Sequence, residues 1–405
     1  MPGAGTRAAI TTNSPAARCL DITRLIRRAG RPMTGVDRVE FAYLRALVEE
    51  PVPLFALART RIGYVLLGPE GAAAIRACAG SEDWGPMDTI GRLLRRGPVA
   101  RRQAEATLRR HALARCLPQG LGAMLRRHLP EGVSYINTGH SNLTDRVLSG
   151  IASVQHARIA VLVHDTIPLD FPQYQRTETL RKFKRFLSRT ARSADLVICN
   201  SQATLRDCQR HLEAFGRIPD GVVAPLGIET VTPDARPDLP DGPYFVTVGT
   251  IEPRKNHALL LDIWDHFATE GRSGPRLLIC GGRGWKNDAV FARLDAGNPL
   301  VQECPGLSDA RIAALLQHSR GLLFPSLAEG YGLPPIEAAA LGVPVLVSDL
   351  DIYRETLADI PIYLPPGDVY SWRKKIEQLA EQKPSSIAFV PPGWDEHFNL
   401  VLSSV

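Results

Sequence analysis

The alternation of short apolar runs with amphipathic segments most constrains the fold of this chain. The apolar runs have the length of buried strands, and the segments between them have the spacing of helices that cover a sheet. Such alternation is typical of parallel sheets whose connections are helices. Residues 231–242 interrupt it with Pro233, Pro237, Pro240 and three aspartates, which indicates a linker. The sequence therefore predicts two doubly wound α/β domains with a ligand cleft between them, at the carboxyl ends of their strands.

The predicted elements fall into two series. In the first, the strands are 19–23, 54–57, 64–67, 134–137, 159–163 and 196–199, and the helices are 35–47, 177–191 and 202–212. In the second, the strands are 244–248, 276–280, 300–303, 321–324, 343–347 and a short one near Ile362, and the helices are 257–269, 309–318, 336–341 and 369–382. The predicted domains are a leader at 1–18, an N-terminal domain at 19–232, a C-terminal domain at 243–385 and a segment at 386–405 that packs back on the N-terminal domain.

The composition is that of a soluble globular protein. With 405 residues, 44% hydrophobic and 22% charged, the chain can bury the cores of two or three domains. No run approaches the roughly 18 apolar residues of a membrane-spanning helix, and the leader has no apolar stretch of the kind found in signal peptides. The seven cysteines form no CxxC pair, and several lie in apolar runs, as Cys199 and Cys280 do. We expect reduced core cysteines in a cytoplasmic protein.

The string FPSLAEGYGLPPIEAAALG, from Phe324 to Gly342, is the most specific motif. It follows an apolar run and places Glu329 and Glu337 around a glycine turn that opens onto a helix, with Glu337 expected in the first helical turn. Free amides at the start of a helix attract phosphate, and the carboxylates can accept hydrogen bonds from hydroxyl groups on either side of a diphosphate. Taken alone, Glu337 is explained by its favourable interaction with the helix dipole, and the glycine turn is a common way for a strand to end. The complete string indicates a sugar nucleotide.

Two adjacent cations, Arg254 and Lys255, follow the first strand of the second series in the string VGTIEPRKNH. Arginine offers a planar fork and lysine a point charge, which together match a diphosphate. Such a pair in isolation usually faces water. Its position at a strand end, in the same domain as Glu329, favours the diphosphate. Fixed donors of this kind neutralise a departing nucleoside diphosphate without a metal.

The first series offers two further candidates. His164 ends the strand 159–163 at the cleft, and the following Asp165 either fixes the tautomer of its ring or caps the turn. The structural alternative is a strand-end histidine bonded to nearby backbone. Gly35, which follows Thr34 and precedes a helix, would approach the same phosphates, although a lone glycine turn is weak evidence.

These strings together resemble the retaining family 4 glycosyltransferases, among the group 1 glycosyltransferases. The resemblance covers most of the chain and is densest from Tyr244 to Tyr353, where the motifs above, a glycine loop at 281–284, the string CPGLSD at 304–309 and the strand near 343–348 follow the order of the family. It implies the GT-B architecture, in which two Rossmann-like domains face a cleft. The first domain departs more, because many relatives carry a double glycine where this chain has Thr34 and Gly35.

The resemblance also implies a site. The implied catalytic residues are Arg254 and Lys255 on the diphosphate, Glu329 on the donor sugar and His164 beside the reacting sugar. The implied donor-binding residues are Glu337 on the ribose, Gly330, Tyr331, Gly332 and Leu333 of the glycine loop and helix start, Gly35 of the first domain, and Cys304, Gly306 and Leu307 beside the base. No metal ligand is expected.

The implied function is that of a retaining, metal-independent glycosyltransferase. It moves a hexose, with mannose favoured, from a nucleotide diphosphate sugar to a saccharide or lipid-linked acceptor in surface polysaccharide assembly. The donor is a co-substrate, and no cofactor is expected. Reaction on the leaving-group face needs no protein nucleophile, unlike glycoside hydrolysis. The alternatives are a nucleotide-sugar epimerase of the same architecture and a nonenzymatic nucleotide-sugar or glycan-binding protein, against which the intact cations and glutamates argue.

Two charged segments need separate interpretation. Asp349 and Asp351 match a DxD metal pattern, but no further ligands accompany them, and we interpret them as a turn. Residues 92–127 carry ten arginines and one acid, Glu105, with interleaved leucines. We favour a solvated surface there; the alternative is peripheral contact with an anionic membrane, at its inner face, that carries the acceptor. The stretch has no Phe, Tyr or Trp on which bases could stack, so no nucleic acid partner is expected.

Overall fold

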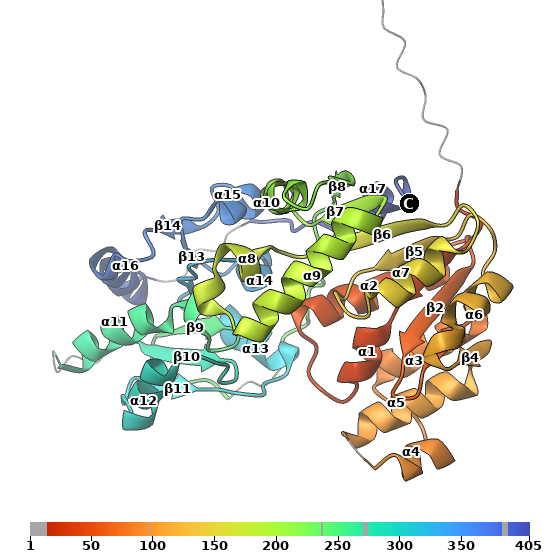
Figure 1. The fold of residues 1–405 in the computed structure, drawn as a ribbon. Helices are drawn as coiled ribbons and strands as arrows, with labels where there is room; N and C mark the ends of the chain where they lie inside the picture. The colour runs from red at the N-terminus through yellow and green to blue at the C-terminus, as the bar shows by residue number, and fades with distance from the viewer. Residues whose placement is uncertain (1–13, 96, 236–237, 270–273, 383–387) are drawn as a thin grey trace, which may run out of the picture.

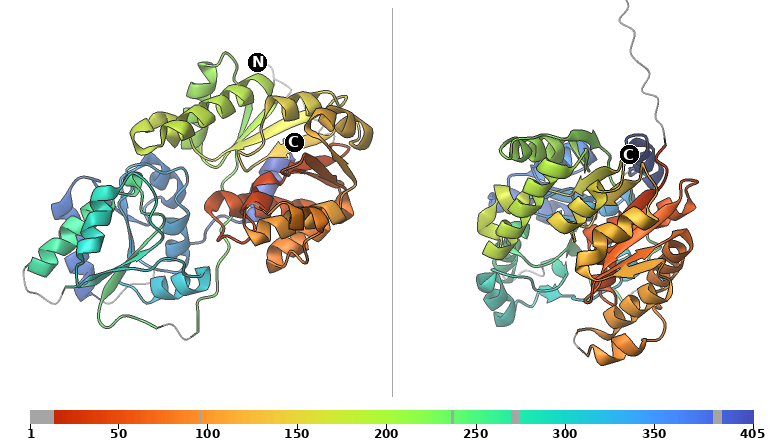
Figure 2. Two further views of the ribbon diagram at one scale, coloured as in Figure 1. Left: turned by 60° about the horizontal axis from the view of Figure 1, so that its bottom comes forward. Right: turned by 45° about the vertical axis from the view of Figure 1, so that its right-hand side comes forward.

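The computed structural model describes residues 14–95, 97–235, 238–269, 274–382 and 388–405. Most of the predicted leader, Arg96 and Pro237 lie outside these ranges. The described chain forms two α/β domains, each built on its own sheet (Figure 1), and the left view of Figure 2 shows the domains side by side. The prediction of two α/β domains is confirmed.

The N-terminal sheet has the strand order β4-β3-β2-β1-β5-β6-β7-β8. Its strands are β1 (Arg18–Asp21), β2 (Leu54–Arg59), β3 (Tyr64–Leu67), β4 (Ala114–Cys116), β5 (Ser134–Asn137), β6 (Arg158–Val163), β7 (Leu196–Cys199) and β8 (Asp220–Val223). The pairs β2–β3 and β3–β4 are antiparallel. The prediction of a parallel sheet was therefore wrong at this edge, because Thr60 N donates to Gly63 O over 2.8 Å in a turn too short for a helical crossover.

The C-terminal sheet is parallel and has the order β11-β10-β9-β12-β13-β14. Its strands are β9 (Tyr244–Val248), β10 (Arg276–Cys280), β11 (Val301–Glu303), β12 (Leu322–Phe324), β13 (Val345–Ser348) and β14 (Ile362–Leu364). All six lie where the sequence predicts strands. Because helices cover both faces of such a sheet, its inner strands are mostly apolar and are recognised without alternation.

Helices connect these strands in both domains. Those of the N-terminal domain are α1 (Thr23–Arg28), α2 (Gly35–Glu49), α3 (Pro69–Ser81), α4 (Thr89–Leu93), α5 (Val99–Arg110), α6 (Leu121–His128), α7 (Asp145–Ala152), α8 (Ile167–Asp170), α9 (Thr177–Ser193) and α10 (Gln202–Glu213). Those that follow are α11 (His257–Thr269), α12 (Asp288–Ala296), α13 (Asp309–Gln317), α14 (Leu333–Ala340), α15 (Asp351–Leu357), α16 (Val369–Glu381) and α17 (Trp394–Leu402). Strands β4 and β8 and helices α1, α3, α4, α5, α6, α7, α8, α12, α15 and α17 were not predicted.

The chain crosses between the domains twice, after β8 and again between α16 and α17. The two crossings touch, because Ile228 N donates to Pro392 O over 3.0 Å. Gly227 is packed against Trp394, where a Cβ on the glycine would lie 2.4 Å from the indole Cγ. The second crossing places α17 beside β8 on the N-terminal domain, and Figure 2 shows this blue helix among the red and orange elements.

His397 attaches α17 to the N-terminal domain. Its Nε2 lies 2.8 Å from the Tyr43 hydroxyl, and its Nδ1 lies 3.1 and 3.0 Å from the carbonyl oxygens of Ala224 and Pro225. A neutral ring with its proton on Nδ1 satisfies every contact, since Nδ1 then donates to the carbonyls and Nε2 accepts from Tyr43. Burial lowers the pKa of His397 to about 4. The docked helix therefore requires the neutral ring.

We expect acid to destabilise the protein through His397. The folded-state pKa of about 4 lies below the ordinary histidine value, so the unfolded chain takes up the proton first as the pH falls below about 6.5. The stabilisation is complete above that pH and is lost towards pH 4, with about 2 kcal/mol lost between pH 7 and pH 5. Urea unfolding of His397→Gln at both pH values should show a correspondingly smaller pH dependence. His111→Gln, a change at an exposed histidine, is the control. An equal pH dependence of the free energy of unfolding in the unsubstituted protein and in both variants would show that His397 is not the cause.

Candidate functional site

Arg254, Lys255 and Glu329 form an ion cluster at the carboxyl ends of β9 and β12. The two cations lie in a 3-10 turn (Pro253–Lys255) before α11, and Glu329 lies in the loop between β12 and α14. Glu329 Oε1 is 2.8 Å from Arg254 Nη1 and 2.6 Å from Lys255 Nζ. Glu252 adds a second carboxylate, whose Oε1 is 2.7 Å from Arg254 Nε. The structure thus brings together three of the four residues predicted to be catalytic.

Burial and charge together set the protonation of this cluster. The Glu329 side chain is only 7% exposed. Burial raises the pKa of Glu329, but the charges of Arg254 and Lys255 outweigh it and lower the pKa to about 2. Burial lowers the pKa of Lys255, and the Glu329 carboxylate acts against that shift. Glu329 Oε1 contacts both cations at once, which holds the carboxylate ionised.

The glycine turn after Glu329 touches the N-terminal domain. A Cβ on Gly330 would lie 2.9 Å from the carbonyl oxygen of His164 and 2.8 Å from Asp165 Cβ. Thr204 Oγ1 donates to Gly330 O over 3.3 Å. Glycine at this position therefore permits the close approach of the two domains.

Gly332 caps the start of α14 in a conformation that favours glycine. Its φ is +83°, and a Cβ there would lie 2.5 Å from the Tyr353 ring. Leu333 Cδ1 lies 3.0 Å from the position of a Cβ on Gly35. Since Gly35 and Leu333 are the first residues of α2 and α14, the amino ends of two helices from different domains meet here. Such ends attract anions.

Tyr331 contributes to the contact between the domains. It is buried, and its hydroxyl donates to Leu226 O over 3.1 Å. The side chain is therefore engaged with the N-terminal domain, and only the backbone of this predicted donor-binding residue remains for a ligand.

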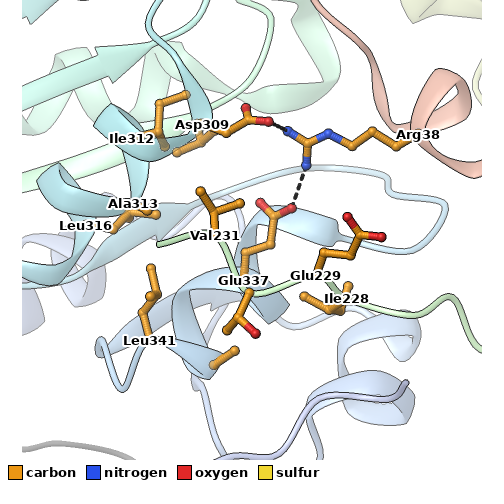
Figure 3. Close-up of a pocket in the computed structure, with 13 residues that line it drawn as sticks. Arg38, Ile228, Glu229, Val231, Asp309, Ile312, Ala313, Leu316, Glu337 and Leu341 are labelled. Carbon is orange, nitrogen blue, oxygen red and sulfur yellow. Dashed lines mark hydrogen bonds and ion pairs between the residues drawn. The ribbon is translucent and has the colours of Figure 1, made fainter. Parts of the chain in front are cut away.

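Glu337 faces an arginine of the other domain. It lies in the second turn of α14, so the expectation of the first turn was wrong, because the helix begins at Leu333 and not at the predicted Ile336. Arg38 Nη1 is 2.8 Å from Glu337 Oε1, and Arg38 Nη2 is 2.6 Å from Asp309 Oδ2 (Figure 3). Burial raises the pKa of Glu337, and Arg38 acts against that shift. One arginine thus joins two carboxylates across the cleft.

A cavity of about 620 Å³ lies between the domains beside this arginine. Five predicted donor-binding residues line it, namely Gly35, Gly306, Leu307, Leu333 and Glu337. A smaller cavity of about 70 Å³ shares Arg38, Asp309 and Glu337 and is otherwise mostly apolar, with Ile312, Leu316 and Leu341 on its wall (Figure 3). The larger cavity has the size of a ligand pocket. Cys304 follows β11, is half-buried and does not line it.

A third cavity, of about 520 Å³, lies beside Glu329. Its wall combines Glu329 and Asp351 of the C-terminal domain with Asp165 and Thr204 of the N-terminal domain. Asp165 Oδ1 accepts from Ile167 N over 3.1 Å, which makes it a turn cap. Burial raises the pKa of Asp165, and Arg254 acts against that shift. The glutamate of the ion cluster therefore has open space on the side of α8 and α10.

His164 is held inside the N-terminal domain at the edge of the cleft. Its side chain is buried, and its Nε2 lies 2.7 Å from Thr138 O. Burial lowers its pKa to about 4, so the ring is neutral and Nε2 donates to that carbonyl. Thr138, and not Asp165, fixes the tautomer. The His164 carbonyl accepts from Asn200 Nδ2 over 2.9 Å and lies against Gly330.

Sequence reasoning missed three charged residues of the site. Arg38 lies in the predicted helix 35–47 and Asp309 ends the string CPGLSD, but neither was given a role, and Glu252 precedes the cations in VGTIEPRKNH. The available signal was position, because each follows a predicted strand or begins a predicted helix on the cleft side. The partner of Arg38 is 299 positions away, so no local pattern shows it.

The other predicted charged segments form ion pairs of their own, although Asp351 also lines the 520 Å³ cavity beside Glu329. Asp349 forms a bidentate pair with Arg354, at 2.9 and 3.0 Å. In the segment 92–127, Arg109 pairs with Asp88 and Arg101 with Glu105. The interleaved apolar residues are divided, since Leu108, Met124 and Leu125 are buried and Leu93, Leu113 and Leu117 are exposed. Among the described residues, no helix has the length and apolar character needed to cross a bilayer.

Comparison with known proteins gives matches in sequence. Residues 234–391 match the family "Glycosyl transferases group 1". The serotype-specific mannosyltransferase WbdA of Escherichia coli is 28% identical over 271 residues, covering 60% of this chain and 33% of the relative. The O-antigen chain mannosyltransferase B of Escherichia coli is 32% identical over 128 residues, with 31% and 34% covered. The O-antigen chain mannosyltransferase RfbU of Salmonella typhimurium is 30% identical over 149 residues, covering 36% of this chain and 40% of the relative. The match thus spans about a third of the length of WbdA.

Comparison with solved structures confirms the expected GT-B fold class. HepE of Anabaena, solved with UDP and glucose, superposes with a TM-score of 0.59 at 14% identity, covering 91% of this chain and 90% of that one. The Escherichia coli trehalose-6-phosphate structure bound with UDP-2-fluoro glucose has a TM-score of 0.55 at 11% identity, with 96% and 94% covered. At these identities the likeness concerns the fold, and it extends over both domains.

Proposed function

We propose that this chain, whose residues 234–391 match the group 1 glycosyl transferases, is a retaining, metal-independent glycosyltransferase. It moves a hexose, with mannose favoured, from a nucleotide diphosphate sugar to a saccharide or lipid-linked acceptor. The proposed setting is the assembly of a surface polysaccharide. The similarity to three mannosyltransferases, two of them named for O-antigen chains, supports the sugar and the setting.

The ion cluster of Glu329 with Arg254 and Lys255 is the observation that carries this proposal. Without a donor, the carboxylate balances two cations that are largely withdrawn from water. A diphosphate brings its own negative charge and takes over the contacts with Arg254 and Lys255. Glu329 is then free to accept hydrogen bonds from hydroxyl groups of the donor sugar.

In the proposed reaction, the bond from the anomeric carbon to the diphosphate oxygen breaks, and a bond to the acceptor oxygen forms on the same face of the sugar. The acceptor hydroxyl gives its proton to the departing diphosphate. Arg254 and Lys255 neutralise the charge that develops on that leaving group. In this proposal Glu329, whose low pKa keeps it ionised, stabilises positive charge on the sugar ring. No side chain acts as a nucleophile.

His164 has a positioning role in this proposal. Its neutral ring is anchored to Thr138, and its carbonyl lies against Gly330, next to Glu329 in the chain. The contact fixes how closely the N-terminal domain approaches the glycine turn. On the other side of that turn, the 620 Å³ cavity with Glu337 accommodates the nucleoside.

Donor screening followed by a transfer assay tests the proposed function. One of the GDP-, UDP- or ADP-linked hexoses should raise the melting temperature, and a radiolabelled form of it should transfer to a saccharide acceptor with EDTA present. Nuclear magnetic resonance of the product should show the anomeric configuration of the donor. Conversion of the donor to its epimer without acceptor would identify the epimerase alternative. Donor binding without turnover would identify a binding protein.

Glu337→Gln should weaken nucleotide binding on the order of 10-fold while the fold remains intact, because a charged acceptor for the ribose is lost. Calorimetry with the nucleoside diphosphate measures the change. Asp309→Asn is the matched control, since Asp309 contacts the same guanidinium of Arg38. Equal losses in both variants would mean that loosening of Arg38 causes the effect, and unchanged affinity in Glu337→Gln would reject a ribose contact.

A further inference from the structure

The exposed face of α9 forms a basic hollow outside the cleft between the domains. A cavity of about 420 Å³ opens along it. The residues that line it are Arg181, Lys184, Arg185, Ser188, Arg189 and Arg192 of α9, Asp145 of α7 and Phe215, which follows α10. Five cations and one carboxylate therefore share this hollow.

The carboxylate neutralises only one end of the hollow. Asp145 Oδ2 is 2.8 Å from Arg189 Nη2, and Asp145 also pairs with Arg192. Arg181, Lys184 and Arg185 are exposed, and none of them has an ion-pair partner among the described residues. The hollow consequently presents three cations without an ion-pair partner among the described residues; Glu178, one turn before Arg181, pairs with Lys182 and acts on Arg181 only at longer range.

The spacing of these three cations has an energetic consequence. Arg181 is three and four positions from Lys184 and Arg185, so the charges are neighbours on one helical face. Like charges at this spacing destabilise a helix, and an anion seated between them removes the repulsion. A phosphate group offers several oxygens, each of which can accept a charge-assisted hydrogen bond. The hollow suits a phosphate better than it suits a neutral saccharide.

The hollow lies on the acceptor side of the proposed active site. Just before α9, Tyr174 O accepts from Trp285 Nε1 over 3.1 Å, and Gln175 O accepts from Lys286 Nζ over 2.5 Å. These contacts place the start of α9 at the C-terminal domain, and Figure 1 shows the helix running from α8 towards β7. Helices α8 and α10 pack on α9 and also line the 520 Å³ cavity that contains Glu329. The helix spans about 25 Å, so a ligand can reach from the hollow towards the cleft.

We propose that this hollow binds phosphate groups that accompany the acceptor. They belong either to a diphosphate that carries the acceptor saccharide or to the headgroups of the lipid surface in which such a carrier sits. The link to the acceptor rests on the proposed function, whereas phosphate binding by α9 does not. The site is distinct from the arginine-rich segment 92–127.

Two triple variants with the same change in net charge test the proposal. One combines Arg181→Gln, Lys184→Gln and Arg185→Gln, and the control combines Arg92→Gln, Arg115→Gln and Arg127→Gln, all exposed arginines of the segment 92–127. Cosedimentation with phosphatidylcholine vesicles that contain phosphatidylglycerol, and calorimetry with inorganic pyrophosphate, are the two measurements. Vesicle binding by the α9 variant should fall on the order of 100-fold, because each cation near an anionic surface contributes separately. The control should bind as the unsubstituted chain does.

The arms of the experiment distinguish the sources of phosphate. Loss of a pyrophosphate-binding event in the α9 variant identifies a diphosphate carrier, and loss of vesicle binding alone identifies lipid headgroups. Lys255→Ala separates this site from the cleft, since it should lose cleft binding of pyrophosphate and keep vesicle binding. Equal losses in both triple variants, or no loss in the α9 variant, would overturn the proposal. Failure of transfer to a soluble saccharide, with vesicle binding intact, would instead count against the proposed function.

Discussion

Replacing Lys255 with alanine is expected to lower the turnover number on the order of 100-fold or more, the usual cost of losing one fixed donor to a developing anion. Lys255 Nζ lies 2.6 Å from Glu329 and 4.1 Å from the centre of the Phe324 ring. The side chain is only 10% exposed, so water cannot replace the lost charge efficiently. Transfer of radiolabelled sugar under saturating donor measures the effect.

The loss of charge at Lys255 must be separated from the loss of packing. Lys255→Met keeps most of the side-chain volume and removes only the charge, so it should lose turnover to a similar extent. Lys374→Ala, on the exposed face of α16, is the matched control for a lysine outside the cleft. Circular dichroism reports whether each variant is folded. Near-normal turnover in a folded Lys255→Met protein would reject a diphosphate contact.

Glu329→Gln is expected to lower the free energy of unfolding by about 3 kcal/mol, because removing one partner of a buried ion pair leaves an uncompensated charge. Arg254 retains the carboxylate of Glu252, while Lys255 loses its contact at 2.6 Å. Transfer should also fall strongly, since the amide cannot balance positive charge on the sugar. Urea unfolding and the transfer assay measure the two effects separately.

An exposed ion pair supplies the comparison for Glu329. Glu303 and Arg283 form a pair at 2.7 Å with side chains 26% and 37% exposed. Glu303→Gln should cost no more than about 1 kcal/mol, as is usual for surface pairs. A similarly small cost for Glu329→Gln would show that water reaches the cluster freely and would undermine the electrostatic part of the argument.

The sequence predicts strands better than it predicts helices in this fold. The strand Tyr244–Val248 is found at its predicted bounds because both faces of a parallel sheet favour apolar residues, which make up four of its five positions. Helix α3 is rich in alanine and glycine and has little contrast between its faces, and α7, with eight residues, is too short to establish a period. Helix α17 lies outside the alternation of strands and helices that defines the C-terminal domain, and its position depends on contacts with the N-terminal domain.

The same distinction applies to the site. Arg254, Lys255 and Glu329 were expected together, and they meet because β9 and β12 are adjacent strands whose carboxyl ends share one edge of the sheet. The pairing of Arg38 with Glu337 joins different domains, and no sequence pattern reports how two domains are oriented. Glu337 was expected in the first helical turn because the helix was predicted to begin after the two prolines, whereas α14 begins at Leu333, before them. Residues at the ends of neighbouring strands can therefore be grouped from local motifs. Contacts between residues of different domains are seen only in the structure.

The paired crossings at Ile228 and Pro392 have a mechanical consequence. Two chain segments that are hydrogen-bonded at one place act as a single pivot, so the domains can rotate about it more easily than they can slide past each other. Points near a rotation axis move least. Gly227, Ile228 and Trp394 line the 620 Å³ cavity, so its wall includes the pivot itself. That cavity should keep its shape while the more distant faces of the cleft open and close, which would let a nucleotide stay seated through successive movements of the domains.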